Sequence, residues 1–481
     1  MGLMNRKAGW MAWGTLAVAL GAAVSVSEAT PVRRAAPALP AASAAKPITD
    51  SHCVDDEGAD PASAPSSRTV PVNSSSTPLA ADSRDPRQNL LDLVQRAIRR
   101  SNSVGASHLL SEAAADDIDE ARAGRLPQVS LTSQLGGIDA GSVGAAPAHG
   151  AQFQGGLTAS TPLYDGGRVH DLTDWRTHLA EAARFGEITA QEQVALQTVS
   201  LALERSRYTV ESEVYGQYAH KMGCLVGALQ TIVTIDRGRS SELVQARKTQ
   251  QQAELSRDQS LSQKRLAEIR LRRFVGDDLP PTEGITSVML DTPSLPDLLT
   301  LASRASEIAS LGAQADALDS YVRAVLDGQK PQIGLLLQAT KSAGAGSSRS
   351  VSGGITLSVP LYNPSTTYTA NGARHRAQAA KLQRDDALEA RKSRMTEVHE
   401  QAEHAMERAR RVVEILHNSE LVRNFTLQQW QQLGKRSLFD VMAAEGDHYN
   451  MRVQYVDALY DTQQSNSLLW SLGLGLAVHL Q

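Results

Sequence analysis

Aromatic residues make up only 4% of this 481-residue chain, which is little for a large globular core. Stretches rich in Ala, Gln, Glu and Arg favour long helices instead. The net charge of −4 leaves no basic excess, so nothing in the composition points to a nucleic-acid partner.

Cysteine is nearly absent, with only Cys53 and Cys224. Cys53 lies in a stretch expected to be disordered and Cys224 lies on an expected helix, so we expect no structural disulfide.

Long apolar runs are missing except at the N-terminus. Residues 1–29 predict a signal peptide, because Arg6 and Lys7 precede an apolar run over 11–26 and a small-residue cleavage site follows. The alternative is a single membrane anchor, although the run is short for a bilayer span. The rest of the sequence predicts no transmembrane helix. The classes of exported protein that remain are a periplasmic protein, a secreted protein and an outer-membrane protein inserted as strands.

Residues 30–87 are rich in Ala, Pro and Ser and predict a disordered extension. The remaining chain divides into two repeats with a linker and a tail. The predicted segments are 88–279, the first repeat; 280–296, the linker; 297–476, the second repeat; and 477–481, the tail.

One motif occurs twice, as QFQGGLTASTPLY over 152–164 and as SVSGGITLSVPLY over 350–362, at an offset of 198. Pro127-Gln128 and Pro331-Gln332 form a second pair upstream. The chain therefore carries one unit twice.

Around these motifs apolar and polar residues alternate, which predicts strands. The strands are expected near 127–138, 151–163, 331–341 and 350–361. Each is roughly 10 residues, enough for a tilted strand to cross a bilayer.

Between the strands, apolar residues step by three and four, which predicts helices. The expected helices are 89–125, about 168–235, about 241–276, 298–326, 369–433 and 438–476. The second would span about 100 Å.

Four strands cannot close a barrel, because about eight is the practical minimum and unpaired strand edges are costly in lipid. We therefore expect oligomers. Two copies give 8 strands and a plugged interior, three give 12 and four give 16, and the polar strand face favours three or four. The helices would project from the barrel as a tube.

The strand ends PLYDGG and PLYNPS and the helix turns GRSSELVQAR and GKRSLFDVMAA resemble the TolC family of outer-membrane channels over about 88–476. The resemblance implies a mainly α fold with membrane β strands, in which duplicated helix-strand-strand-helix units form a trimeric 12-stranded β-barrel in the outer membrane and a long periplasmic α-helical barrel. The long N-terminal extension resembles the subgroup that serves type I secretion of toxins, typified by the cyclolysin exporter.

The function implied is a passive conduit, with no enzymatic activity and no cofactor, for type I protein secretion or drug efflux. A periplasmic adaptor and an inner-membrane pump of the ABC or RND type would open it, and the pump would choose the exported substrate. The alternatives are a periplasmic adaptor, which would have one helical hairpin and more strands, and a structural coiled-coil protein. A surface enzyme is the weakest, since the sequence has no P-loop, GxSxG or GxGxxG motif.

The resemblance places a charged periplasmic gate at the second helix turn, on Arg436 and Asp440. A few charge pairs at a constriction can hold an aperture closed. Two further acidic positions of the family fall on Ala443 and Val244 here, so the network would be incomplete. Alternatively, Arg436 and Asp440 are ordinary solvated turn residues.

The two helix tips are the expected adaptor contacts. They comprise Gly238, Arg239 and Ser240 in the first tip, and Gly434, Lys435 and Ser437 in the second. Turn chemistry alone would also explain the Gly and Ser.

No metal site is predicted. His399 and His404 are five positions apart, whereas zinc-binding helices use four. His170, Asp174 and His178 share a helix face, which is more typical of a solvated surface.

Overall fold

The computed structural model describes residues 85–140, 148–282, 284–433, 435–473 and 475–480, all within one compact unit, Ser67–Gln481. The predicted signal peptide 1–29 and nearly all of the extension 30–87 lie outside the described residues. Helix α1 begins at Pro86, with the Asp85 side chain capping it, so the last two residues of the segment 30–87 are helical.

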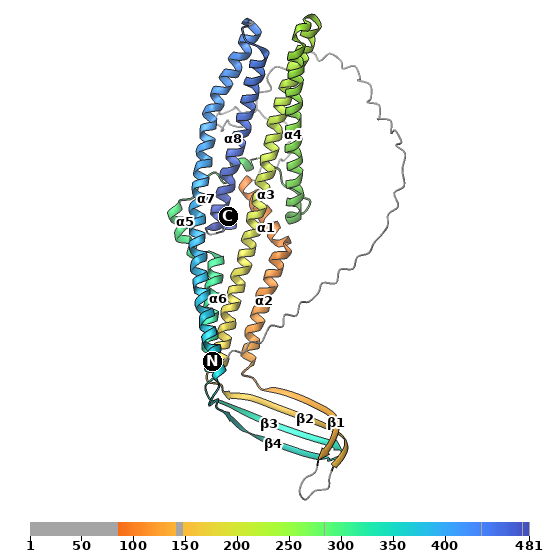
Figure 1. The fold of residues 1–481 in the computed structure, drawn as a ribbon, viewed down its shortest axis with the longest axis vertical. Coiled ribbons are helices and arrows are strands. Elements are labelled where there is room, and N and C mark those ends of the chain that lie inside the picture. The colour runs from red at the N-terminus through yellow and green to blue at the C-terminus, as the bar shows by residue number, and fades with distance from the viewer. Residues whose placement is uncertain (1–84, 141–147, 283, 434, 474, 481) are drawn as a thin grey trace, which may run out of the picture. The chain divides into compact units, whose positions relative to one another are not determined.

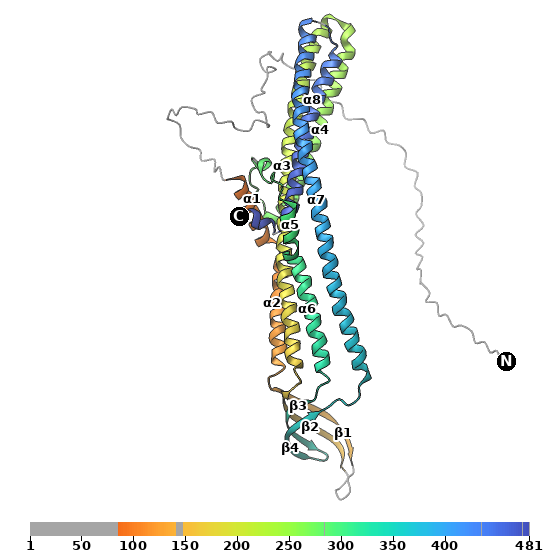
Figure 2. The same ribbon diagram turned by 90° about the vertical axis from the view of Figure 1, so that its left-hand side faces the viewer.

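The described residues form two repeats, each with a pair of strands that has helices before and after it in the sequence (Figures 1 and 2). The first repeat contains α1 (Pro86–Arg100), α2 (Asn102–Ala123), β1 (Gln128–Ala140), β2 (Ala148–Tyr164), α3 (Arg168–Ile235), η2 (Arg237–Arg239) and α4 (Ser240–Val275). A connector with η3 (Ile285–Ser287) leads to the second repeat. It contains α5 (Leu295–Leu301), η4 (Ala302–Arg304), α6 (Ser306–Asp327), β3 (Gln332–Gly344), β4 (Ser348–Ser358), α7 (Pro364–Leu433), α8 (Leu438–Leu472) and α9 (Leu476–Leu480).

The strands form one antiparallel sheet in the order β1-β2-β3-β4. They hold 13, 17, 13 and 11 residues, longer than the expected 10. β4 ends at Ser358 and not at 361, whereas β2 continues to Tyr164. The difference arises because β2 has a neighbour on each side and its end pairs with β3 at Ile333, while within the described chain β4 pairs with β3 only.

Two predicted helices are each broken in two. Ser101 adopts an extended backbone between α1 and α2, and its hydroxyl accepts from the Val104 amide, which starts a new helix. Ala305, also extended, separates η4 from α6. Ser101 precedes Pro127 by 26 residues and Ala305 precedes Pro331 by 26, so the repeat includes these breaks.

The predicted long helices are confirmed. α3 has 68 residues and α7 has 70, and α7 starts at Pro364, five residues earlier than expected. The alanines of its seam, Ala402, Ala405 and Ala409, are buried. Within the described residues no helix is both long and apolar enough to cross a membrane.

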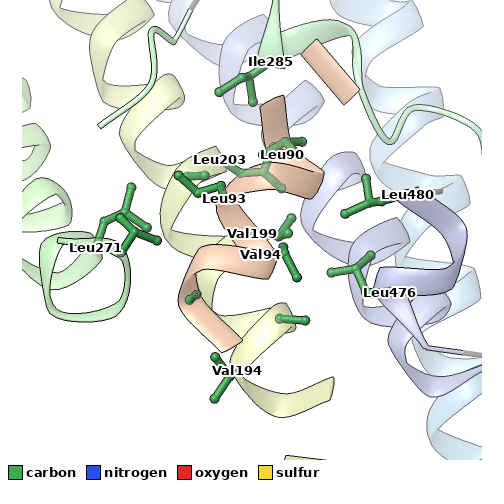
Figure 3. Close-up of a cluster of buried hydrophobic side chains, with 14 of the residues drawn as sticks. Leu90, Leu93, Val94, Val194, Val199, Leu203, Leu271, Ile285, Leu476 and Leu480 are labelled. Atoms are coloured by element: carbon green, nitrogen blue, oxygen red, sulfur yellow. The ribbon is translucent and has the colours of Figure 1, made fainter. Parts of the chain in front are cut away.

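A buried cluster joins elements from both repeats (Figure 3). It combines Leu93 of α1, Val199 and Leu203 of α3, and Leu271 of α4 with Leu480 of α9. Most of the segment 477–481, predicted as a C-terminal tail, belongs to helix α9, and Leu480 is only 2% exposed.

The linker 280–296 is anchored by two buried amides of α8. Gln463 Nε2 donates to the Val288 carbonyl at 2.8 Å, and Asn466 Nδ2 donates to the Met289 carbonyl at 3.0 Å. Its irregular backbone thus obtains the hydrogen bonds that a buried segment requires.

The expectation about cysteine is wrong. Cys224, on α3, is disulfide-bonded. Cys53, the other cysteine of the sequence, lies outside the described residues.

Candidate functional site: a two-faced sheet and two helix tips

One face of the sheet is apolar and exposed. Residues in register lie on the same face of neighbouring strands. One row across the sheet consists of Leu131, Leu157, Ala339 and Val351, which pair in that order. Leu131 is 79% exposed and Val351 72% exposed. A single soluble chain would hide such a surface, so this face requires an apolar environment.

The opposite face carries hydroxyl and amide side chains. A row of Thr132, Gly156, Thr340 and Ser350 crosses the four strands. The Thr340 and Ser350 hydroxyls are 2.7 Å apart. The predicted division into apolar and polar faces is therefore confirmed.

The DGG sequence after β2 fixes the start of α3. The two Asp165 carboxylate oxygens accept from the amides of Gly167 and Val169, at 3.1 and 2.7 Å. Gly166 and Gly167 have positive φ, and a Cβ on Gly167 would come within 2.7 Å of Asp327 Oδ2. Lys330 Nζ donates to the Gly166 carbonyl at 2.9 Å, which ties this junction to the second repeat.

At the first helix tip, the named residues make local turn contacts. The Gly238 amide donates to Asp236 Oδ1 at 2.9 Å, and the Ser240 hydroxyl donates to the Arg237 carbonyl at 2.7 Å. Arg239 Nε lies 3.9 Å from Glu242 Oε2. Gly238 and Ser240 are exposed and Arg239 is half-buried.

At the second tip, Ser437 and Asp440 form a reciprocal capping box. Ser437 Oγ accepts from the Asp440 amide at 3.3 Å, and Asp440 Oδ2 accepts from the Ser437 amide at 3.1 Å. Arg436 Nε donates to Gln429 Oε1 at 3.2 Å. Arg436 and Asp440 are both exposed, and each contacts its own hairpin. Lys435 is exposed beside them, and Gly434 lies outside the described residues.

The two tips are held together by an apolar cluster. Met222 and Leu229 of α3 pack in one cluster with Ala246 of α4 and with Leu438 and Met442 of α8. Leu438 immediately follows the capping residue Ser437. The position of the second tip therefore depends on its packing against the first hairpin.

A charged cluster joins α3 to α8 below the tips. Arg207 Nε lies 2.6 Å from Glu211 Oε1 and Arg207 Nη2 lies 2.7 Å from Asp457 Oδ1. Burial opposes the charge on Arg207, but the hydrogen bond to Glu211 and the charge of Asp457 together raise its pKa. Burial also raises the pKa of the Glu211 carboxyl. Sequence spacing did not indicate this cluster, because its members come from helices about 250 residues apart.

The candidate histidines His170 and His178 each contact a carboxylate on their own helix. His170 lies 3.8 Å from Asp174, and His178 lies 3.6 Å from Glu181. No group of three or more potential metal ligands occurs in the part of the chain that the structure describes.

No family model and no curated protein matches the chain. Several solved structures do. CusC, solved in work on transmembrane channel formation, has a TM-score of 0.72 at 15% identity, covering 81% of this chain and 92% of CusC. The outer-membrane protein VceC of Vibrio cholerae has a TM-score of 0.69 at 16% identity, covering 81% of this chain and 97% of VceC.

The outer-membrane channel MtrE of Neisseria gonorrhoeae, in its open state, has a TM-score of 0.67 at 16% identity and covers 81% of this chain and 89% of MtrE. At such identities the likeness establishes the fold. The expected fold, mainly helical with duplicated strand-helix units, is confirmed.

Proposed function

We propose that this protein is an outer-membrane channel of the TolC family, acting as a passive conduit in a tripartite export system. The observation that carries the proposal is the sheet with one exposed apolar face and one polar face. An apolar face directed to lipid and a polar face directed to water are the features of a membrane β-barrel. The fold shared with solved outer-membrane channels supports it.

The sheet must be completed by further copies. Its outer strands, β1 and β4, each have one neighbour among the described residues. In hydrocarbon, each unsatisfied backbone N–H or C=O group of an unpaired strand edge costs roughly several kcal/mol. We therefore propose that β4 of one copy pairs with β1 of the next, and that three copies give a 12-stranded barrel with the helices extending into the periplasm.

The helix tips are proposed to face the adaptor and to hold the gate. Arg436 and Asp440 lie together at the second tip, where charges from three copies would surround a constriction. The turn between α3 and α4 and the turn between α7 and α8 lie at the same end of the hairpins (Figure 1). The first turn region holds Gly238, Arg239 and Ser240, and the second holds Lys435 and Ser437. These positions support a membrane-fusion adaptor docking there, with an ABC or RND pump beyond it.

Planar-bilayer recording of detergent-purified protein tests the conduit and its gate. We expect small cation-preferring currents that grow in Arg436→Ala and Asp440→Ala. Because Asp440 also caps α8, Ser437→Ala is the matched control, since it removes one half of the capping box without changing charge. Currents that grow equally in Ser437→Ala would assign the effect to the cap. A monomer without conductance would reject the channel and favour the adaptor.

Type I protein secretion is the narrower proposal, based on the long extension before residue 88. Co-expression with an ABC exporter and its toxin substrate, compared with an RND pump and its drug substrate, tests it. Restored toxin secretion with no change in drug resistance would support type I secretion, and the reverse would assign drug efflux.

A further inference from the structure

Two cations interrupt the apolar face of the sheet. Lys341 of β3 and Arg349 of β4 are register partners, and both side chains are exposed. On its other side Lys341 pairs with Gly155 of β2. Because glycine has no side chain, β2 places none next to the cations in this row. Like charges directly opposite one another on neighbouring strands are destabilising. An anion bound between them would remove this repulsion.

The described residues supply no such anion. Neither Lys341 nor Arg349 forms an ion pair or a side-chain hydrogen bond within the part of the chain that the structure describes. The only acidic residue within the four described strands, Asp139, is engaged by His149, with 2.5 Å between Oδ1 and Nδ1. The pair of cations therefore offers an unused anion site.

An apolar groove lies beside the cations. It has a volume of about 490 Å³ and runs across the sheet face. Leu131, Phe153 and Leu157 line it together with both cations. Gly155, between Phe153 and Leu157 in the sequence, also lines it. A groove of this lining accepts a hydrocarbon chain, and its charged border accepts an anionic group.

The cations lie at the far limit of a bilayer-spanning strand. Lys341 is the tenth residue of β3 counted from its helix end at Gln332, and Arg349 is the second residue of β4 counted from the hairpin. A tilted strand crosses the hydrocarbon in about 9–11 residues. Charged side chains on a lipid face are costly at the midplane and tolerated at the interface. Given the proposed outer-membrane orientation, on which this step rests, the pair lies at the level of the outer-leaflet headgroups.

We propose that Lys341 and Arg349 bind a phosphate of a lipid A-type glycolipid, with one of its acyl chains in the adjoining groove. Arginine binds phosphate oxygens through two parallel N–H groups and lysine adds a point charge. A phosphate monoester carries up to two negative charges near neutral pH, which matches two cations. The phosphodiester of an ordinary phospholipid carries one.

Lipid titration tests the site. Purified wild-type protein and the Lys341→Gln/Arg349→Gln variant are titrated in detergent with diphosphoryl lipid A, phosphatidylglycerol and inorganic phosphate, and bound lipid is counted by native mass spectrometry. We expect lipid A to bind the variant at least 10-fold more weakly. Arg247→Gln/Lys248→Gln on α4 makes the same charge change on exposed helix residues and should bind as wild type does.

Three outcomes of the lipid titration overturn the site. They are lipid A binding unchanged in the double variant, phosphatidylglycerol binding as tightly as lipid A, and inorganic phosphate displacing lipid A at equal concentration. A double variant whose oligomers dissociate while lipid A still binds would show that a carboxylate of a neighbouring copy pairs with the cations, which also overturns it. Bilayer currents recorded on the same samples separate the two proposals: absent wild-type currents reject the channel, whereas normal currents with cation-independent lipid binding reject only this site.

Discussion

At the scale of single residues, the buried charges of the helical region are matched by specific partners. Arg391 of α7 is the clearest case, with a side chain 9% exposed. Its Nε and one Nη donate to the Leu472 carbonyl at the end of α8, at 3.0 and 2.7 Å, and Nη1 lies 2.9 Å from Glu307 Oε2. Arg391 thus satisfies a carbonyl that a helix end leaves unpaired.

Replacing Arg391 with methionine keeps the apolar stem and removes these bonds. We expect a loss of about 2–3 kcal/mol in the free energy of unfolding, because hydrogen bonds to charged groups are worth about that much. The melting temperature of the detergent-solubilised protein measures it. Arg394→Met is the control, since Arg394 forms an exposed pair with Glu397. Equal shifts in the two variants would contradict the assigned role.

Glu192 of α3 makes stability depend on pH. Burial raises the pKa of its carboxyl above the ordinary 4.5, although the Ser306 hydroxyl, 2.8 Å from Oε2, and Arg391 oppose the change. A raised pKa means that the folded state binds more protons than the unfolded state between the two pKa values. The contribution of Glu192 is therefore fully present below pH 4.5 and is lost as pH rises through its folded pKa.

Glu192→Gln keeps an acceptor for Ser306 and removes the ionisation. We expect the variant to gain in melting temperature relative to wild type on going from pH 4 to pH 8. Thermal melts at both values measure this. A difference between the two proteins that stays the same at both pH values would show that Glu192 titrates alike in the folded and unfolded chain.

At the scale of elements, the sequence predicted those boundaries that neighbouring residues in the chain determine. Pro127 and Pro331 end helices because proline restricts its own φ and its predecessor's, and the sequence alone placed both strand starts within a residue. The breaks at Ser101 and Ala305 were missed. A serine or an alanine is compatible with a continuing helix, so these breaks depend on how α1 and α5 pack.

The C-terminal helix α9 also could not be predicted from local sequence, because it has only five residues and is buried by its contacts with α1 and α3. Leu480→Ala should lower the free energy of unfolding by about 2–4 kcal/mol through the cavity it leaves. Val478→Ala, at a position 57% exposed in the same helix, should change it by less than about 0.5 kcal/mol. Thermal melts of both variants measure the difference. Similar effects would show that α9 is not packed as described.

The tips were predicted in part. The sequence located both turns, and the pattern of Ser437 followed three residues later by Asp440 is a recognisable capping signal. The packing of Leu438 and Met442 against α3 was not visible, because it joins residues about 210 positions apart. Whether Arg436 and Asp440 form a gate stays a prediction, since its geometry depends on other copies.

At the scale of the whole molecule, the internal duplication predicts how copies join. The joint between the two repeats pairs Leu157 of β2 with Ala339 of β3. The motif offset of 198 residues maps Leu157 onto Ile355. The offset of 204 residues, which separates Pro127 from Pro331, maps Ala339 onto Leu135. If neighbouring copies repeat the internal joint, Ile355 lies opposite Leu135 of the partner subunit, and both residues belong to the apolar face.

Cysteine cross-linking measures this register. Leu135→Cys/Ile355→Cys should form covalent oligomers on mild oxidation, because opposed Cβ atoms are about 4.5–5.5 Å apart. Leu135→Cys/Thr356→Cys is the matched control, since Thr356 lies on the polar face. Covalent oligomers in the control variant, with none in Leu135→Cys/Ile355→Cys, would contradict the register. The number of copies follows from the size of the largest species.

The two junctions that lead from the sheet into the long helices, β2 to α3 and β4 to α7, differ in stiffness. After β2, the chain is clamped by Asp165, by two positive-φ glycines and by Lys330. After β4, five residues separate the strand from α7, and Leu361 and Tyr362 are 92% and 89% exposed. Torque applied at the tips will therefore bend the second junction first, so that the hairpin of α7 and α8 acts as a lever on a compliant joint while α3 stays anchored.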